Sequence, residues 1–568
     1  MPYVNGVYMS APGTAVVIND QNFMGSSSAG GQGVIFIGPA VDGQPNTALS
    51  ISNPQQASAL LKGGDLLQGV LNAYAGAKKV GGSINVTVID PTPRTQSTSA
   101  INSSGAVEQI ALTTTSYGTL ANSSKWQVTA GSPGYNVTLA TDFVGPGGQT
   151  YPPASTSNIA LSPASLYYNG TGTAPTYTVS DTELVLTATT TDTGGTITFS
   201  SSMTVQQLVN QVNQLPGWGA VVTDPNTADL VEGLFDNVTT ATAVSTTSTA
   251  PTSLTANVTA VVRWVNANGV YFTATRQTGA TSLATSGAWT YATGGTTPTA
   301  TNTNWQAAYT TAQAVTNSMF ITCVSPSYTL WAMNDAHCHY MASIGIPRRG
   351  YVGDSSGQTT ATENVQIALL NSNRTSVVWP EQQGVNYNGQ VTTFAPYLEA
   401  CAVLGERAAA IPYNALTQQP VPSQGMGQTV TPSMVAQELS AGMAILAPNQ
   451  QGIVVLQQDR TTWLQNTAFD KVENSTGIVA DIVTTDLNQT LGTFVGKPVT
   501  PMSVAQATSA VFSRLNYWYS QGFLSVQPKL SDISLSGSGT SITGSATAAF
   551  DVPANYIVLQ LYPVAYGQ

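Results

Sequence analysis

The side chains that could perform chemistry are gathered between residues 335 and 357. Asp335, His337 and Cys338 are followed by Ser355, within the run Gly353-Asp354-Ser355-Ser356-Gly357. These residue types are similar to the parts of a serine hydrolase, in which a carboxylate orients a histidine that takes the nucleophile's proton. Fewer than twenty residues separate His337 from Ser355. This is much closer than in chymotrypsin, and the chain order of subtilisin is not matched either. We therefore predict a helix followed by a turn, with no catalytic residue.

The two histidines, His337 and His339, are also the natural candidates for metal ligands. Residues i and i+2 of a helix point to different sides of it, so this pair is poorly arranged for one ion. The run Gly30-Gly31-Gln32-Gly33 precedes a strand instead of following one, which is the wrong context for a dinucleotide-binding loop. No P-loop motif is present. We expect no metal, no cofactor and no enzymatic activity.

The chain is unusually poor in charge. Charged residues make up 8% of its 568 residues, against about 25% in ordinary soluble domains. The net charge is −11, and the closest cations, Lys78-Lys79 and Arg348-Arg349, are isolated pairs. Direct binding of nucleic acid, which needs clustered cations, is therefore not expected. A surface of Thr, Ser, Asn, Gln and Gly gives little repulsion between copies. This composition fits a self-assembling protein and a secreted or surface-exposed β-rich protein equally well.

Three further features bear on location. We identify no secretory signal at the N-terminus. No apolar run approaches the ~18 residues that a membrane span needs, so we expect no membrane insertion. Cys323, Cys338 and Cys401 are scattered and odd in number. They fit free buried thiols in a reducing compartment better than a disulfide framework.

The elements that must position these residues follow two patterns. Apolar strands alternate with helices in residues 25–100 and 295–410, which is typical of an α/β domain with a mainly parallel sheet. The strands are expected at 33–39, 84–90, 319–324, 350–353 and 376–380. Residues 101–294 are rich in Thr, Ser, Gly and Asn. Their short alternating runs, one of them at 258–264, predict antiparallel β-structure interrupted by one helix at 204–213. We interpret this block as a β-rich insertion into the α/β domain.

The remaining segments are the C-terminal part, residues 411–568, and an N-terminal arm, residues 1–24. The C-terminal part has a strand at 452–456 and a long amphipathic helix after Pro501. Both chain ends carry short apolar strands, whose unpaired N–H and C=O groups can pair with another chain. We predict that these strands join copies of the chain. The residues assigned to them are Val4, Val7, Tyr8, Val16, Val17, Ile18, Tyr556, Val558, Gln560 and Tyr562.

Four groups of residues, taken in order, resemble the contractile tail sheath proteins of bacteriophages, a family shared with pyocins and type VI secretion sheaths. The resemblance covers most of residues 1–95 and 295–568, and the insertion matches only in position. The four groups are Gly6-Val7-Tyr8 with Ala11-Pro12-Gly13-Thr14 and the run from Gly33 to Ala40; Gly294-Gly295-Thr296 with Asn304-Trp305; Asp335-Ala336-His337-Cys338 with the run from Arg348 to Gly353; and Gly496-Lys497-Pro498-Val499-Thr500 with Gly522-Phe523 and Tyr562-Pro563-Val564.

The resemblance implies a fold and a function. The fold would be an α/β core made of a "subtilisin-like" middle domain (25–100 plus 295–410) and an α+β inner domain (411–568), with an inserted β-rich domain and extended terminal arms. Subunits would stack as six-fold rings around an inner tube, and arms of neighbours would add strands to one core sheet. Contraction would drive the tube through the host envelope. Lys497 and Arg514 would be candidates to face the tube.

The implied partners are copies of the chain, the tail tube protein, and baseplate and neck or terminator proteins. The implied location is the tail of a virion, after assembly in the host cytoplasm. Two alternatives stay open at this point. The Thr-rich insertion also suits a secreted adhesin or surface-layer protein, and the residues between 335 and 357 alone favour a hydrolase.

Overall fold

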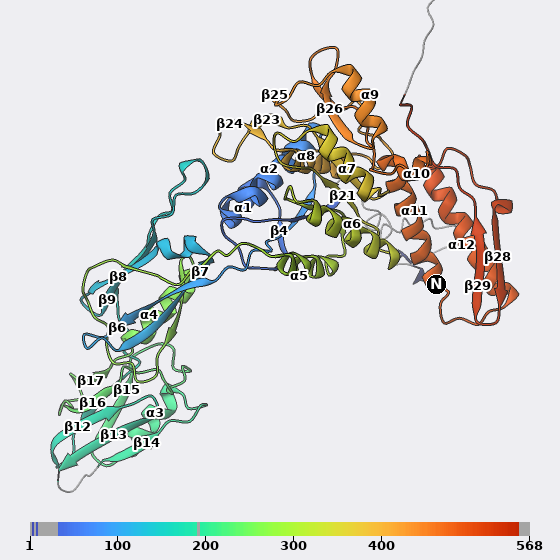
Figure 1. Ribbon diagram of the computed structural model, residues 1–568. Coiled ribbons are helices and arrows are strands. Elements are labelled where there is room, and N and C mark those ends of the chain that lie inside the picture. Colours follow the sequence, from blue (N-terminus) through green and yellow to red (C-terminus); the bar gives the residue numbers. More distant parts are fainter. Residues whose placement is uncertain (1–2, 5–6, 9–31, 190–193, 556–568) are drawn as a thin grey trace, which may run out of the picture. The chain divides into compact units, whose positions relative to one another are not determined.

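The computed structural model describes residues 3–4, 7–8, 32–189 and 194–555. The chain forms two compact units (Figure 1). The first consists of Met1–Ala40, Asn46–Pro91 and Thr301–Gln568, and the second of Val41–Pro45 and Thr92–Ala300. The expected insertion, residues 101–294, falls inside the second unit. The expected C-terminal domain falls inside the first unit, together with most of the expected middle domain. Residues 41–45, 92–100 and 295–300 of the middle domain belong to the second unit. The boundaries of both domains therefore stay predictions.

An eight-stranded sheet is the centre of the first unit. Its six inner strands are parallel, and its two edge strands are antiparallel to their neighbours, which confirms the mainly parallel sheet. Strands from before and after the second unit lie side by side, so both stretches build one sheet. The order across the sheet is β27 (Val454–Leu456), β26 (Ala444–Pro448), β22 (Thr375–Trp379), β21 (Arg349–Val352), β20 (Ser318–Cys323), β3 (Gly33–Ile37), β5 (Asn85–Ile89) and β4 (Leu49–Ile51).

Helices cover both faces of this sheet, as buried parallel strands require. Helices α1 (Pro54–Leu61), α2 (Gly64–Lys79) and α8 (Pro396–Ala409) pack on one face. Helices α5 (Asn302–Gln313) and α6 (Tyr328–Ser343) pack on the other. Helix α8 was not expected from the apolar pattern. Helix α8 is buried along its whole length apart from Tyr397, so it shows no amphipathic period.

Helices α2 and α8 approach each other closely because glycines stand at their contact. A Cβ on Gly76 would lie 2.0 Å from the carbonyl oxygen of Ala402, and a Cβ on Gly405 would lie 2.1 Å from that of Ala73. No larger side chain fits at either position without moving a helix.

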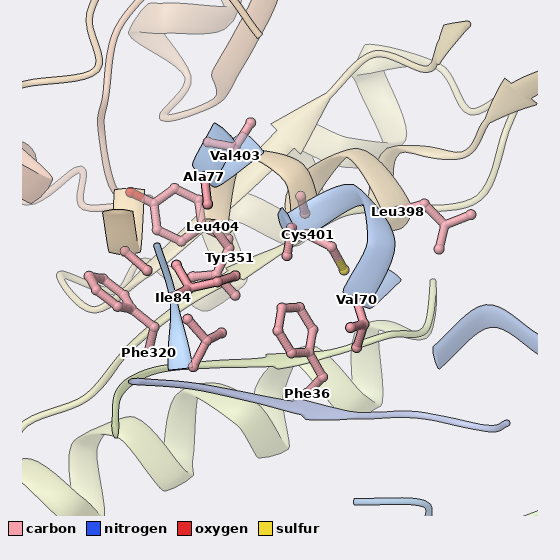
Figure 2. Close-up of a cluster of buried hydrophobic side chains, with 14 of the residues drawn as sticks. Phe36, Val70, Ala77, Ile84, Phe320, Tyr351, Leu398, Cys401, Val403 and Leu404 are labelled. Atoms are coloured by element: carbon pink, nitrogen blue, oxygen red, sulfur yellow. The ribbon is translucent and has the colours of Figure 1, made fainter. Parts of the chain in front are cut away.

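The main hydrophobic core lies between the sheet and these two helices. Figure 2 shows Phe36 and Phe320 on the same side of the sheet as Val70 of α2 and Cys401 of α8. Val34 belongs to the same cluster as Phe36, because alternate residues of a strand share one face. Full burial of such a side chain contributes about 1.5–3 kcal/mol.

The first unit ends in a helical pair and a hairpin. Helices α11 (Asn474–Gly492) and α12 (Pro501–Ser520) pack through a cluster that includes Val479, Val511 and Leu515. Helix α12, the predicted long helix, starts at a capping box formed by Thr500 and Ser503. The remaining elements are α7 (Thr360–Leu370), β23 (Gln382–Val385), β24 (Val391–Phe394), β25 (Gly425–Met426), α9 (Pro432–Ser440), α10 (Phe469–Val472), β28 (Ile533–Ser538) and β29 (Ser541–Ala546).

The second unit consists of antiparallel sheets around two hydrophobic clusters. No helix among the described residues of the whole chain is both long enough and apolar enough to cross a membrane. The strands are β6 (Gln96–Asn102), β7 (Glu108–Tyr117), β8 (Ser124–Ala130), β9 (Tyr135–Thr141), β10 (Ala154–Ile159), β11 (Ala164–Tyr168), β12 (Thr173–Val179), β13 (Glu183–Thr189), β14 (Gly195–Thr198), β15 (Trp218–Val222), β16 (Val238–Ala243), β17 (Thr252–Leu254), β18 (Phe272–Arg276) and β19 (Thr290–Tyr291).

The described residues of this unit contain two α-helices where the sequence predicted one helix. Helix α3 (Val205–Val212) confirms the helix expected at 204–213. The strand expected at 258–264 is wrong, because these residues lie in helix α4 (Asn257–Asn268). Val258, Val261 and Val265 are buried at helical spacing, whereas Val262 and Trp264 only pack at the edge of the cluster. The run of β-branched residues concealed the helical period.

Candidate functional site

His337 is a hydrogen-bond acceptor for a buried cation. Arg348 Nη1 donates to His337 Nε2 at 2.7 Å and to the carbonyl oxygen of Ala312 at 3.0 Å, and Arg348 Nη2 donates to that of Val315. Burial, together with the Arg348 charge, lowers the pKa of His337 to about 4. The Arg348 guanidinium thus binds carbonyl groups at the end of α5. The neutral His337 ring accepts one further hydrogen bond from the same guanidinium.

Ser355 and His339 have separate surroundings. The Ser355 hydroxyl contacts Asp354 and the side chain of Gln358. His339 is half-exposed, whereas His337 is buried, which confirms that the two histidines face different sides of the helix. Among the described residues, no group of three His, Cys, Asp or Glu side chains is arranged to hold a metal ion.

A serine, a histidine and an aspartate do meet, but they are not the three that the sequence placed within twenty residues of one another. Asp335 Oδ1 accepts from the hydroxyl of Ser372 at 2.5 Å and from that of Thr375 at 2.7 Å. His339 Nε2 lies 3.2 Å from the Ser372 hydroxyl and 3.7 Å from Asp335 Oδ2. Because the serine proton points to the carboxylate, the histidine does not receive it as a general base would. The cluster ties α6 to the start of β22.

The run from Arg348 to Gly353 is instead the centre of a buried polar network. Arg349 Nε donates to Asp481 Oδ2 at 2.8 Å, and Arg374 donates to both oxygens of the same carboxylate at 3.1 and 3.0 Å. Two cations at the sheet therefore share one anion on α11. This contact fixes α11 against the ends of β21 and β22.

A second carboxylate, Asp459, lies deeper in the unit. It accepts from Tyr351 at 2.9 Å, from Asn474 at 3.0 Å and from Arg407 at 3.2 Å. The side chains of Arg407 and Asp459 are both fully buried. Asn474 also donates to Ser376 of β22 at 2.8 Å. The network therefore joins two strands, helix α8 and the first residue of α11.

The two glycines of this run are required by close contacts. A Cβ on Gly350 would lie 2.3 Å from Asn334 Nδ2, and a Cβ on Gly353 would lie 2.4 Å from the carbonyl carbon of Pro396. The residues of the run that resemble the sheath family thus have packing and hydrogen-bonding roles in this structure.

Sequence reasoning missed Asp459, Arg407, Asn474 and Asp481 as members of one network. A usable signal was present, because a charged residue inside an apolar run is unusual in so uncharged a chain. Arg407 follows Glu406 in the otherwise apolar second half of α8, where a buried ion must find a partner. The identity of that partner depends on tertiary contacts.

Lys497 and Arg514, the candidates to face a tube, differ in their surroundings. Lys497 is exposed, with its ammonium 4.8 Å from the centroid of the Phe494 ring. Arg514 forms a two-bond ion pair with Asp486 at 2.7 and 2.6 Å. Its guanidinium also lies 4.6 Å from the Tyr517 ring centroid. The charge of Arg514 is therefore already balanced within the subunit.

The predicted arm residues lie mostly outside the described part of the chain. Tyr3–Val4 (β1) and Val7–Tyr8 (β2) form a short antiparallel pair with each other. The backbone positions of Val4, Val7 and Tyr8 are thus described, whereas Val16, Val17, Ile18, Tyr556, Val558, Gln560 and Tyr562 fall outside the described residues. Their assignment to intersubunit strands stays a prediction.

Cys323, Cys338 and Cys401 are free and buried, as expected. Burial raises the pKa of the Cys323 thiol to about 12. The three thiols are therefore unreactive parts of the core.

No family model matches this chain, and no curated protein sequence matches it. Solved structures do. A sheath tail protein from Desulfitobacterium hafniense is 12% identical, with a TM-score of 0.54 over 94% of this chain and 93% of that one. A sheath tail protein from Listeria innocua is 13% identical, with a TM-score of 0.53 over 91% of this chain and 92% of that one. The fold of this chain is that of the tail sheath proteins.

Proposed function

We propose that this chain is the repeating structural subunit of a contractile sheath. The observation that carries the proposal is the likeness of fold to two sheath tail proteins over more than nine tenths of each chain. The likeness extends through both compact units, so it does not depend on one common α/β motif. In this view the strands of the eight-stranded sheet that precede residue 411 belong to the subtilisin-like domain of sheaths. Residues 411–568 form the inner domain and also add β26 and β27 to that sheet.

Copies of the subunit would be joined by strand addition. The hairpin β28–β29 is a two-stranded sheet within the described residues, and most of its side chains are exposed. A lone hairpin is marginally stable, and its outer edges offer unpaired backbone groups. We infer that the terminal arms of neighbouring subunits add strands to this hairpin and make a continuous mesh.

The buried network suits a subunit that moves as a rigid body. Asp459 accepts hydrogen bonds from Asn474 of α11 and Tyr351 of the sheet, and Asp481 of α11 pairs with Arg349, so buried contacts tie α11 to the sheet. Contraction would then change the packing between subunits while each core keeps its structure, as in other bistable assemblies. The low charge of the chain favours such close packing of copies.

The proposed partners follow from this role. Six-fold rings would stack around a tube protein and meet baseplate and neck or terminator proteins, in the tail of a virion assembled in the host cytoplasm. Both Lys497 and Arg514 are kept as candidates to face the tube. Lys497 is the stronger one, because Asp486 already neutralises Arg514. The role requires no nucleotide, metal or catalytic residue.

Negative-stain microscopy of the purified full chain tests the proposal. We expect rings or tubes with a hollow core, and sedimentation of large species that depends on protein concentration. Discrete monomers under every assembly condition would contradict the proposal and favour an adhesin or surface-layer protein.

A further inference from the structure

The last described residues of the chain are held against the start of α11 and the segment that follows α12. Ser525 N–H donates to the carbonyl oxygen of Ala549 at 2.9 Å, and the Thr476 hydroxyl donates to that of Asp551 at 3.4 Å. Asn555 Nδ2 donates to Glu473 Oε1 at 2.6 Å. We call residues 551–555 the tail root, because the predicted intersubunit strand begins at the next residue.

The contact between Asn555 and Glu473 leaves two buried oxygen atoms without a hydrogen bond. Glu473 Oε2 and Asn555 Oδ1 are both buried acceptors without a donor. Glu473 is fully buried, and its other oxygen already accepts from Asn555 and from Gln458. A single proton on Oε2 would give both orphaned oxygens a hydrogen bond, because a carboxylic acid and a primary amide form a cyclic pair with two bonds.

We propose that Glu473 is a proton-operated latch for the tail root. Protonated Glu473 donates from Oε2 to Asn555 Oδ1 while Asn555 Nδ2 donates to Oε1. Loss of the proton leaves two acceptors facing each other and a buried negative charge, so the tail root detaches and water reaches the carboxylate. The latch is a property of the subunit by itself. Only its consequence for assembly, control over the strand that begins at residue 556, rests on the proposed function.

The charges around Glu473 support this assignment. The pKa of Glu473 is raised to about 7, mainly by burial, and the negative charge of the neighbouring Asp459 acts in the same direction. Hydrogen bonds from Gln458 and Asn555 and the charge of Arg460 act in the opposite direction. A cavity of about 340 Å³ has Arg460, Trp463 and Glu473 among its lining residues.

Hydrogen exchange of residues 549–555 in the full-length, unassembled subunit tests the latch. The pKa of Glu473 is about 7 when latched and near 4.3 when solvated. Linkage then predicts that exchange, corrected for its intrinsic pH dependence, speeds up by roughly 80-fold from pH 5 to pH 8. In Glu473→Gln the amide can donate as the acid does, so we expect slow exchange at every pH. In Asn555→Ala we expect fast exchange at every pH.

Glu399→Gln is the matched control, because Glu399 is a buried glutamate of raised pKa on α8. It should leave the pH response of the tail root unchanged. Exchange of 549–555 that does not respond to pH in the unaltered chain, or that responds equally in Asn555→Ala, would overturn the latch. Absence of tubes in microscopy would overturn the proposed function and leave the latch standing.

Discussion

Replacement of Asp459 by Asn should strongly destabilise the first unit. Asp459 and its partner Arg407 are fully buried, and the carboxylate also accepts from Tyr351 and Asn474. An asparagine keeps the shape, removes the charge and places N–H donors where other donors already point. Breaking one side of a buried ion pair in this way costs about 3–5 kcal/mol. That is a large share of the ~5–15 kcal/mol by which proteins are typically stable.

The assay is urea unfolding followed by circular dichroism, with the free energy taken from the midpoint and slope. Asp470→Asn is the matched control, because Asp470 is exposed in the same unit and such changes usually stay within about 0.5 kcal/mol. A double-mutant cycle with Arg407→Met should give a coupling energy of at least ~1 kcal/mol. A loss below ~1 kcal/mol in Asp459→Asn, or no coupling, would refute the view that this pair holds α8 to the rest of the unit.

Three further predictions concern packing, titration and assembly. Gly405→Ala should cost about 1–3 kcal/mol in thermal unfolding, because its Cβ would meet the backbone of Ala73; an unchanged melting temperature would mean that α2 and α8 can separate freely. Burial raises the pKa of Glu399 to about 8 in the folded chain, above its value of about 4.3 in the unfolded chain. The contribution of Glu399 to the free energy of unfolding is therefore complete below about pH 4.3 and is lost as the pH rises to about 8. Glu399→Gln should therefore flatten the decline in unfolding free energy over that range, and an unaltered slope would contradict this. Removal of residues 1–18 should leave a folded subunit that does not polymerise in sedimentation; unfolding would instead show that the arm belongs to its own core.

The strands and helices with a clear apolar pattern were predictable. The runs at 33–39, 84–90, 319–324, 350–353 and 376–380 all contain strands of the one sheet. Their length of four to seven residues and their β-branched and aromatic side chains are typical of buried strands. Helix α12 was predicted from its stripe and from Pro501. Helix α4 was missed because its valines favour a strand locally, and burial at helical spacing overrides that preference.

The residues between 335 and 357 show what residue types alone leave undecided. His337, Ser355 and Asp335 have the chemistry of a hydrolase, yet each contacts a different partner in the structure. Spacing along the chain was sufficient to argue against catalysis. It was not sufficient to find the structural roles of Arg348 and His337, because those depend on carbonyl groups at the end of α5.

The amino-acid sequence by itself determined the alternation of strands and helices, the β-rich character of residues 101–294 and the low surface charge, because these follow from local pattern and composition. Only the tertiary structure decided which charges meet. Asp459 with Arg407, Asp481 with Arg349, and Glu473 with Asn555 are pairs far apart in the chain, brought together by sheet order and helix packing. A buried ion must find a partner, but its own neighbours in sequence do not specify which one.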